Sequence, residues 1–311
     1  MHPLIAAIVE VGGAAGRRHL TDRGFTDREL RAAVRAGVIQ RARRGWYTVW
    51  PRGDSRFAAL RLGGRLTGLA AIEALGGWVL RPPRLEVAVP RNASRLRDPH
   101  RRRPLRDRSR RGVTVHWVAQ AHDRDTSSGI VPVAEALRVV IREETREVAI
   151  AAVDWALRTG ALDHDGLAAL ARSIPRPLVP RLREADALCD SLPESLARSR
   201  LRAAGLQVRS QVEVEGAGPI DLVIEGVVAL EVDGDRFHRD RFEQDRAKDL
   251  VITAAGMHVL RPSARHVFDD WSAVVRAVRR ALRERVALPP GQDRPVRLRR
   301  NTRARSALPS A

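Results

Sequence analysis

Three carboxylates lie inside stretches that otherwise have the pattern of buried β-strands, and this feature constrains the fold most. Asp221 stands between apolar neighbours, and Glu231 and Asp233 alternate with Leu230 and Val232. Carboxylates are rare in strands of high β-propensity, and residues two apart in a strand point to the same face. Because clustered buried carboxylates are costly without a cation, the pattern predicts a Mg²⁺ site on Asp221, Glu231 and Asp233.

The alternative is a salt-bridged strand on a solvated sheet face, because arginines are abundant. The turn between the two strands distinguishes these interpretations. A two-residue loop, Glu225-Gly226, would place Asp221 and Glu231 on opposite faces. A turn centred on Gly226 pairs Asp221 with Glu231, and glycine suits the left-handed conformation of such turns. We predict this odd-length turn, with Asp221, Glu231 and Asp233 on one face.

The carboxylates belong to a segment with the predicted order αβββαβα. Its first helix begins at Ser191-Leu192-Pro193-Glu194, and Gly205 ends it. The expected later elements are strands over 208–214, 219–224 and 227–233, a helix over 239–255, a strand over 257–261 and a helix over 270–286.

Three more residues of this segment are candidates for chemistry at the same site. His238 is a candidate base or acid, with an ordinary loop histidine as the alternative. Lys248 is the only lysine of the chain and offers a proton-tunable cation that arginine cannot imitate; the alternative is a surface lysine. Glu194 is the third candidate; the alternative is that it completes a capping box with Ser191.

The order and spacing of these residues resemble the Vsr-like endonuclease domains, also called domain of unknown function 559, of the PD-(D/E)XK nuclease superfamily. The resemblance covers about 190–285 and rests on Pro219-Ile220-Asp221, Glu231-x-Asp233-Gly234, His238, Asp245, Lys248-Asp249 and Gly256…Leu260-Arg261. It implies a restriction-endonuclease-like fold and Mg²⁺-dependent phosphodiester hydrolysis. Asp221 and Glu231 match the metal-binding acids, and His238 matches a histidine that helps in catalysis. The resemblance also implies a helical glutamate at the position of Glu194, often near the metal. Asp233 occupies the position of the superfamily's lysine, which leaves the general base open.

Residues 1–50 have the pattern of a winged helix-turn-helix, with three helices before a hairpin. Thr26-Asp27-Arg28-Glu29 is a capping box that begins a helix ending at Gly37. Basic residues lie on the exposed face of this helix and in the hairpin turn. A basic helix in the major groove and a basic wing on phosphates predict DNA binding; a small helical domain with solvated arginines is the alternative. The candidate DNA-binding residues are Arg28, Arg31, Arg35, Arg43 and Arg44.

This region and the next resemble the AbiEi-type antitoxins of type IV toxin–antitoxin systems, over roughly 1–175. The resemblance rests on the helix 27–36, the wing Arg43-Arg44-Gly45-Trp46-Tyr47, and expected elements at 67–76, 85–90, 113–118 and 133–142. It implies an N-terminus that reads DNA and an antitoxin-like second domain of αβ type.

Charge and cysteine content narrow the class of protein. The formal net charge of +19 favours a polyanionic partner, although heavy use of arginine weakens that argument. The single Cys189 excludes a disulfide framework and any Cys-cluster metal site, including the structural zinc of Vsr enzymes. No uncharged run approaches the ~20 residues that cross a bilayer, so we expect a cytoplasmic protein without membrane contact.

The expected fold class is α/β: a winged helix-turn-helix at 1–50, an antitoxin-like αβ middle domain at 51–185, a nuclease domain at 190–287 and a disordered basic tail at 288–311. The first functional hypothesis is a Mg²⁺-dependent DNA endonuclease. The second is an AbiEi-like antitoxin and transcriptional repressor whose nuclease fold is inactive. DNA is the expected partner under both, and a cognate toxin is a further partner under the second.

Overall fold

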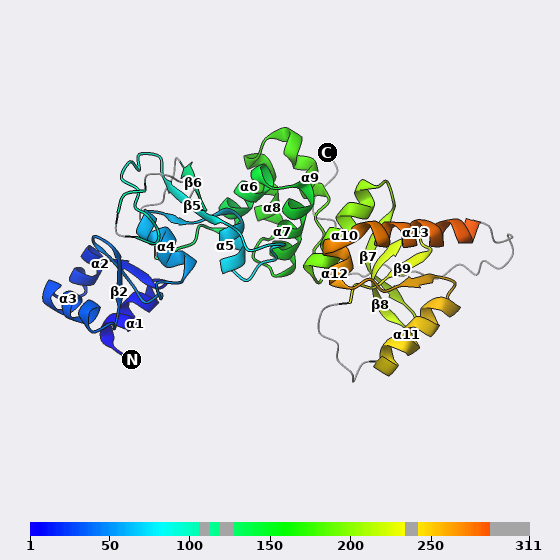
Figure 1. Cartoon of the computed structure of the whole chain (residues 1–311), viewed down its shortest axis with the longest axis horizontal. Coiled ribbons are helices and arrows are strands. Elements are labelled where there is room, and N and C mark those ends of the chain that lie inside the picture. Colours follow the sequence, from blue (N-terminus) through cyan, green and yellow to red (C-terminus); the bar gives the residue numbers. More distant parts are fainter. Residues whose placement is uncertain (102, 106–111, 119–126, 234–241, 287–311) are drawn as a thin grey trace. The chain divides into compact units, whose positions relative to one another are not determined.

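The structure is a computed structural model that describes residues 1–101, 103–105, 112–118, 127–233 and 242–286. The chain is mixed α/β with several small sheets. It divides into two compact units, Met1–Glu143 and Glu144–Ala311, whose helices and strands are labelled in Figure 1. Within the described residues, no helix is long and apolar enough to span a membrane.

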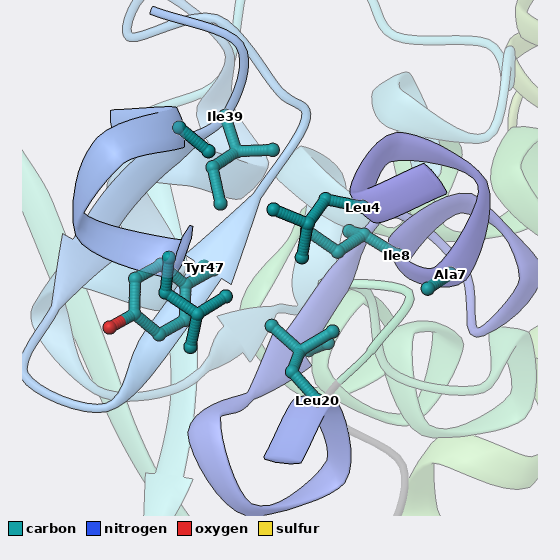
Figure 2. Close-up of a cluster of buried hydrophobic side chains, with 9 residues drawn as sticks. Leu4, Ala7, Ile8, Leu20, Ile39 and Tyr47 are labelled. Atoms are coloured by element: carbon teal, nitrogen blue, oxygen red, sulfur yellow. The ribbon is translucent and has the colours of Figure 1, made fainter. Parts of the chain in front are cut away.

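The first unit begins with helices packed on a small sheet. Its elements are α1 (Pro3–Glu10), β1 (Ala14–Gly16), α2 (Arg17–Asp22), α3 (Asp27–Arg35), β2 (Gln40–Arg43) and β3 (Trp46–Thr48), and the sheet order is β1-β3-β2. The predicted capping box at Thr26 and Glu29 is confirmed. Apolar residues of α1, α2 and β3 meet in one core, where Leu4, Ile8, Leu20 and Tyr47 are buried (Figure 2).

The rest of the first unit is a second three-stranded sheet with helices against it. Its elements are α4 (Ser55–Leu62), β4 (Arg65–Leu66), α5 (Gly68–Ala74), β5 (Leu85–Pro90), β6 (Val113–Val118) and α6 (Val133–Glu143). The order is β4-β5-β6, with β5 and β6 parallel. Both long strands have the bounds that the sequence predicts.

The second unit joins a group of helices to a four-stranded sheet. The helices before the sheet are α7 (Arg146–Arg158), α8 (His164–Ser173), the short η2 (Arg176–Leu178), α9 (Val179–Arg183) and α10 (Leu192–Ala203). The later elements are β7 (Val208–Val214), β8 (Gly218–Ile224), β9 (Val228–Leu230), α11 (Phe242–Ala254), β10 (His258–Leu260), α12 (Ala264–Asp269) and α13 (Trp271–Val286). The division after Glu143 does not coincide with the expected boundary at 185–190.

The sheet of this unit has the order β10-β9-β8-β7, with β9 and β10 parallel and the other neighbours antiparallel. The turn between β8 and β9 confirms the predicted register. Ile224 pairs with Val228 and Leu222 with Leu230, so the turn holds three residues and Asp221 lies opposite Glu231. Glu225 and Gly226 adopt φ of 51° and 69°, the left-handed conformation expected of such a turn.

Helix α11 covers the face of the sheet that carries these two carboxylates. Val223 and Ala229 pair across β8 and β9 and pack in one cluster with Ile252 of α11. Asp221 and Glu231 lie two residues from this pair, on the same face. Figure 1 shows α11 and α13 on opposite sides of the sheet.

One expected strand is shorter than predicted, and one helix was not predicted. The run 227–233 forms a strand only over Val228–Leu230; beyond it, the amides of Glu231 and Asp233 still bond to the carbonyls of Leu260 and Pro262. The helix α12 precedes α13 and was not expected. The tail 288–311, His238 and the start of the expected helix 239–255 lie outside the described residues.

Candidate active site

Asp221 and Glu231 form the centre of a buried polar cluster. Asp221 Oδ2 accepts a hydrogen bond from the amide of Val232 at 2.9 Å. Only 8% of Glu231 is exposed. Burial raises the pKa of both carboxyls, and the charge of Asp221 raises the pKa of Glu231 further. The pair is therefore poised to accept a proton or a cation.

Lys248 of α11 supplies positive charge to this pair. Its Nζ lies 2.7 Å from Glu231 Oε1 and donates to Glu231 Oε2 at 2.9 Å and to the carbonyl of Pro219 at 2.7 Å. Lys248 precedes Ile252 by four residues, so both side chains leave the helix on the side that faces the sheet. Of the two alternatives for Lys248, the structure favours the site residue over the surface lysine.

The Glu194 side chain bonds to the start of α10 but does not complete the predicted capping box, because it accepts from the Asp190 amide and not from the Ser191 amide. Its carboxylate accepts from the Ser191 hydroxyl at 2.7 Å and from the Asp190 amide at 2.9 Å, so it helps to cap α10. Its Oε2 also accepts from Gln211 Nε2 at 3.3 Å. Burial, and next the charge of Asp221, raises the pKa of Glu194 to about 7.

Gln211 links Glu194 to the central pair, and the sequence analysis missed it. Its Nε2 donates at 3.3 Å to both Glu194 Oε2 and Asp221 Oδ1. The residue lies in β7 with φ of 47°, between the pairs Ser210–Leu222 and Val212–Ile220. Left-handed backbone at a residue other than glycine is strained and concentrates at functional sites. The β7–β8 register places Gln211 opposite Asp221. A prediction of this register from the sequence is the signal that could have identified Gln211 as a site residue.

Asp233 does not join this cluster. It lies 3.6 Å from Arg261, which also pairs with Asp245 at 3.6 Å and Asp249 at 2.8 Å. Its amide bonds to the carbonyl of Pro262 at 3.0 Å, which ties it to the segment after β10. Arg261 is therefore its observed counter-charge.

The donor set of the cluster is compatible with Mg²⁺. Glu231 Oε1 is buried and, among the described residues, lacks a hydrogen-bond partner of good geometry. Glu194, Asp221 and Glu231 do not offer three ligand atoms within 4.8 Å of one another. Mg²⁺ commonly uses one or two carboxylates, with water and substrate phosphate as the other ligands. Asp221 and Glu231 therefore suffice as protein ligands.

The candidate DNA-binding arginines lie on two elements of the first unit. Arg28, Arg31 and Arg35 are exposed on α3, opposite the buried Leu30 and Ala33. Arg44 is exposed in the β2–β3 turn. These four side chains are accessible to a polyanion.

Arg43 differs from the other four. It is half-buried and lines a cavity of about 340 Å³ together with Trp46, Arg65 and Arg95. Burial, and next the charge of Arg97, lowers the pKa of Arg43. Arg43 is thus less accessible to a phosphate backbone than Arg44.

No family model matches this chain, and no curated protein matches it. The resemblances to Vsr-like endonucleases and AbiEi-type antitoxins therefore stay predictions.

Proposed function

We propose that this chain binds DNA through its first unit and hydrolyses DNA phosphodiester bonds in its second unit, with Mg²⁺. The observation that carries the proposal is the cross-strand placement of Asp221 and Glu231 with Lys248 on the same face. Two buried carboxylates and one amine at a sheet face match the needs of phosphodiester hydrolysis: charge neutralisation and proton transfer.

Hydrolysis joins a water oxygen to phosphorus and breaks one ester P–O bond, with one water proton going to a base and one to the leaving oxygen. Mg²⁺ held by Asp221 and Glu231 would supply positive charge at the phosphate and acidify water. Lys248 supplies a second positive charge beside Glu231, where charge develops on the phosphate oxygens. Gln211 keeps Asp221 in place through its bond to Oδ1.

Lys248 provides a cation that the strand lacks because Asp233 occupies the position of the superfamily's lysine. The sequence has a carboxylate where the resemblance would place a lysine, and this argues against activity. The amine of Lys248 reaches Glu231 from α11 instead, at 2.7 Å. A cation is therefore present at the carboxylate pair without a lysine in the strand.

We infer further that residues 1–50 act as a winged helix-turn-helix. The order α1-β1-α2-α3-β2-β3, the β1-β3-β2 sheet and the exposed arginines of α3 support this inference. The same arginines also support the second candidate function, a DNA-binding repressor of antitoxin type. Such a repressor needs DNA binding by the first unit and no catalysis by the second unit.

A plasmid-nicking assay tests the enzymatic proposal. We expect supercoiled DNA to be nicked or linearised with Mg²⁺ and unchanged with EDTA. Asp221→Asn and Lys248→Met should each slow the reaction by roughly 10²–10³-fold, as loss of transition-state stabilisation does in other hydrolases. Asp269→Asn is the matched control, since Asp269 is exposed on α12 and pairs only loosely with Arg265 at 3.8 Å.

Absence of hydrolysis with Mg²⁺ or Mn²⁺ on plasmid and single-stranded DNA would overturn the enzymatic proposal and leave the repressor. Equal activity of Asp221→Asn and the wild type would attribute the cleavage to another site.

A further inference from the structure

A second group of potential metal ligands lies in the first unit, apart from the carboxylate cluster. Glu86 of β5, His116 of β6 and Glu143 of α6 each offer one ligand atom, and these atoms lie within 4.8 Å of one another. Glu86 and His116 are largely buried, whereas Glu143 is half-exposed at the end of its helix.

The sheet register brings Glu86 and His116 together. Ala88 pairs with His116 and Glu86 with Thr114 in the parallel β5–β6 ladder. Residues two apart share a face, so Glu86 and His116 point to the same side of the sheet. Glu143, the last residue of α6, reaches the other ring nitrogen: its Oε1 lies 3.2 Å from His116 Nδ1.

The neighbouring helix α5 holds Glu86 in a fixed orientation. Glu86 Oε1 accepts from the amide of Leu69 at 3.2 Å, at the start of α5. A Cβ on Gly68 would lie 1.9 Å from Glu86 Oε2, so the glycine leaves the space that the carboxylate occupies. The remaining oxygen, Oε2, is 3.6 Å from His116 Nε2. Such outer bonds orient ligands in metal sites.

The contact between Glu86 and His116 is not a hydrogen bond. A separation of 3.6 Å is too long, and His116 Nε2 is buried with no hydrogen-bond partner in the described part of the chain. Two ligand atoms bound to one tetrahedral ion at ~2.0–2.2 Å lie about 3.3–3.6 Å apart. The 3.6 Å between Glu86 Oε2 and His116 Nε2 is close to this spacing. One ion binds only one ring nitrogen, so the 3.2 Å contact of Glu143 with Nδ1 is not a second spacing of this kind; Glu143 joins the set because the three ligand atoms lie within 4.8 Å of one another.

Charge also favours a cation at this position. Glu143 lies at the carboxyl end of α6, where the helix dipole disfavours a negative side chain. Among the described residues, Glu86 and Glu143 form their ion pairs with His116 and not with a lysine or arginine. We propose that Glu86, His116 and Glu143 bind one divalent transition-metal ion, for which Zn²⁺ is the suitable probe. One nitrogen and two oxygen donors suit Zn²⁺ or Mn²⁺ better than Mg²⁺.

The ion would join the end of α6 to the β5–β6 sheet and leave one coordination position for water. A proton is the competing occupant, because Glu86 and then Glu143 raise the pKa of His116. A direct measurement of metal binding distinguishes a bound metal ion from a bound proton.

The test is calorimetric titration of the EDTA-treated full-length chain with Zn²⁺, in an Asp221→Asn background that weakens the carboxylate cluster of the second unit. We expect one Zn²⁺ per chain, and Co²⁺ in its place should show the visible absorption of a low-symmetry site. His116→Ala and Glu143→Gln should each weaken Zn²⁺ binding by about 10–100-fold or more. Glu135→Gln removes the same charge from the first turn of α6 and should bind as tightly as the parent.

Glu143→Gln keeps the test decisive if His116→Ala fails to fold, because Glu143 is half-exposed at a helix end. If the parent chain takes up no Zn²⁺, a proton holds the three residues together and the proposal is wrong. Zn²⁺ binding that neither substitution weakens would also overturn it.

Discussion

Burial gives Glu194 a protonation behaviour that can be measured. Its pKa rises from an ordinary 4.5 to about 7 because the carboxyl is buried near Asp221. The folded chain then binds more protons than the unfolded chain between these pH values. The contribution of Glu194 to stability is therefore full below about pH 4.5 and is lost as the pH rises to about 7.

Glu194→Gln removes this titration, and the comparison is made by urea unfolding between pH 4 and 8. The free energy of unfolding of the wild type, relative to Glu194→Gln, should fall by up to about 1.4 kcal/mol per pH unit in that window. The difference should be flat above it. Parallel pH curves for the two proteins would show that Glu194 titrates normally.

Arg43 and Arg44 are adjacent in sequence but differ in accessibility. Arg44 is exposed in the turn, while Arg43 lines a cavity beside Trp46. We expect Arg44→Gln to lower the salt slope of DNA binding by about 0.9, the value for one phosphate contact. Arg43→Gln should change the slope less. Fluorescence anisotropy between 50 and 300 mM salt measures both, and equal slopes would mean that Arg43 turns outward on DNA.

At the scale of elements, the length of the β8–β9 turn could be predicted, because an odd or even number of loop residues decides which face each side chain takes. Placing Asp221 and Glu231 on one face requires an odd loop, and Gly226 is suited to its left-handed position. The contact of Lys248 with Glu231 depends on how α11 packs on the sheet, and the sequence alone left Asp245 of the same helix as an equal candidate. Gln211 could not be predicted from composition, because its role depends on a backbone irregularity in β7. Glu86, His116 and Glu143 lie far apart in sequence, so only tertiary packing brings them together.

The turn itself is open to a stability test. Gly226 has φ of 69°, and a Cβ there would meet no atom within 4 Å. Gly226→Ala should therefore cost about 1–2 kcal/mol from backbone strain alone. Gly226→Asn should cost less, since asparagine tolerates the left-handed region. Equal losses in urea unfolding would indicate that the turn changes conformation on substitution.

Helices α7 and α10 are joined by a buried ion pair. Asp154 and Arg198 are fully buried, with 2.6 Å between Arg198 Nη2 and Asp154 Oδ2. Arg198→Met should destabilise the second unit by about 3–5 kcal/mol, because it leaves the buried Asp154 carboxyl without its counter-charge, with only the Ser195 hydroxyl and the Asp186 amide bonded to it. The double variant Asp154→Asn/Arg198→Met should recover part of this loss. The matched control is Arg280→Met, which removes an exposed pair with Glu284 and should cost less than about 1 kcal/mol.

At the scale of the whole molecule, the proposed DNA-binding residues and the proposed catalytic residues lie in different compact units, so substitutions should separate the two activities. The triple variant Arg28→Gln/Arg31→Gln/Arg35→Gln should bind DNA more weakly and with a smaller salt slope, by about 0.9 for each lost phosphate contact. Asp221→Asn should bind as the wild type does and cleave at least roughly 10²-fold more slowly.

A control for net charge is needed, because a chain of formal charge +19 attracts DNA without a specific surface. Substituting three exposed arginines on the helices α8, η2 and α9 of the second unit lowers the net charge by the same amount. These are Arg172, Arg176 and Arg183. If both triple variants lose affinity equally, binding follows the overall charge and the winged-helix interpretation is wrong. If only the α3 variant loses affinity while its nicking at low salt persists, DNA recognition belongs to the first unit and the chemistry to the second.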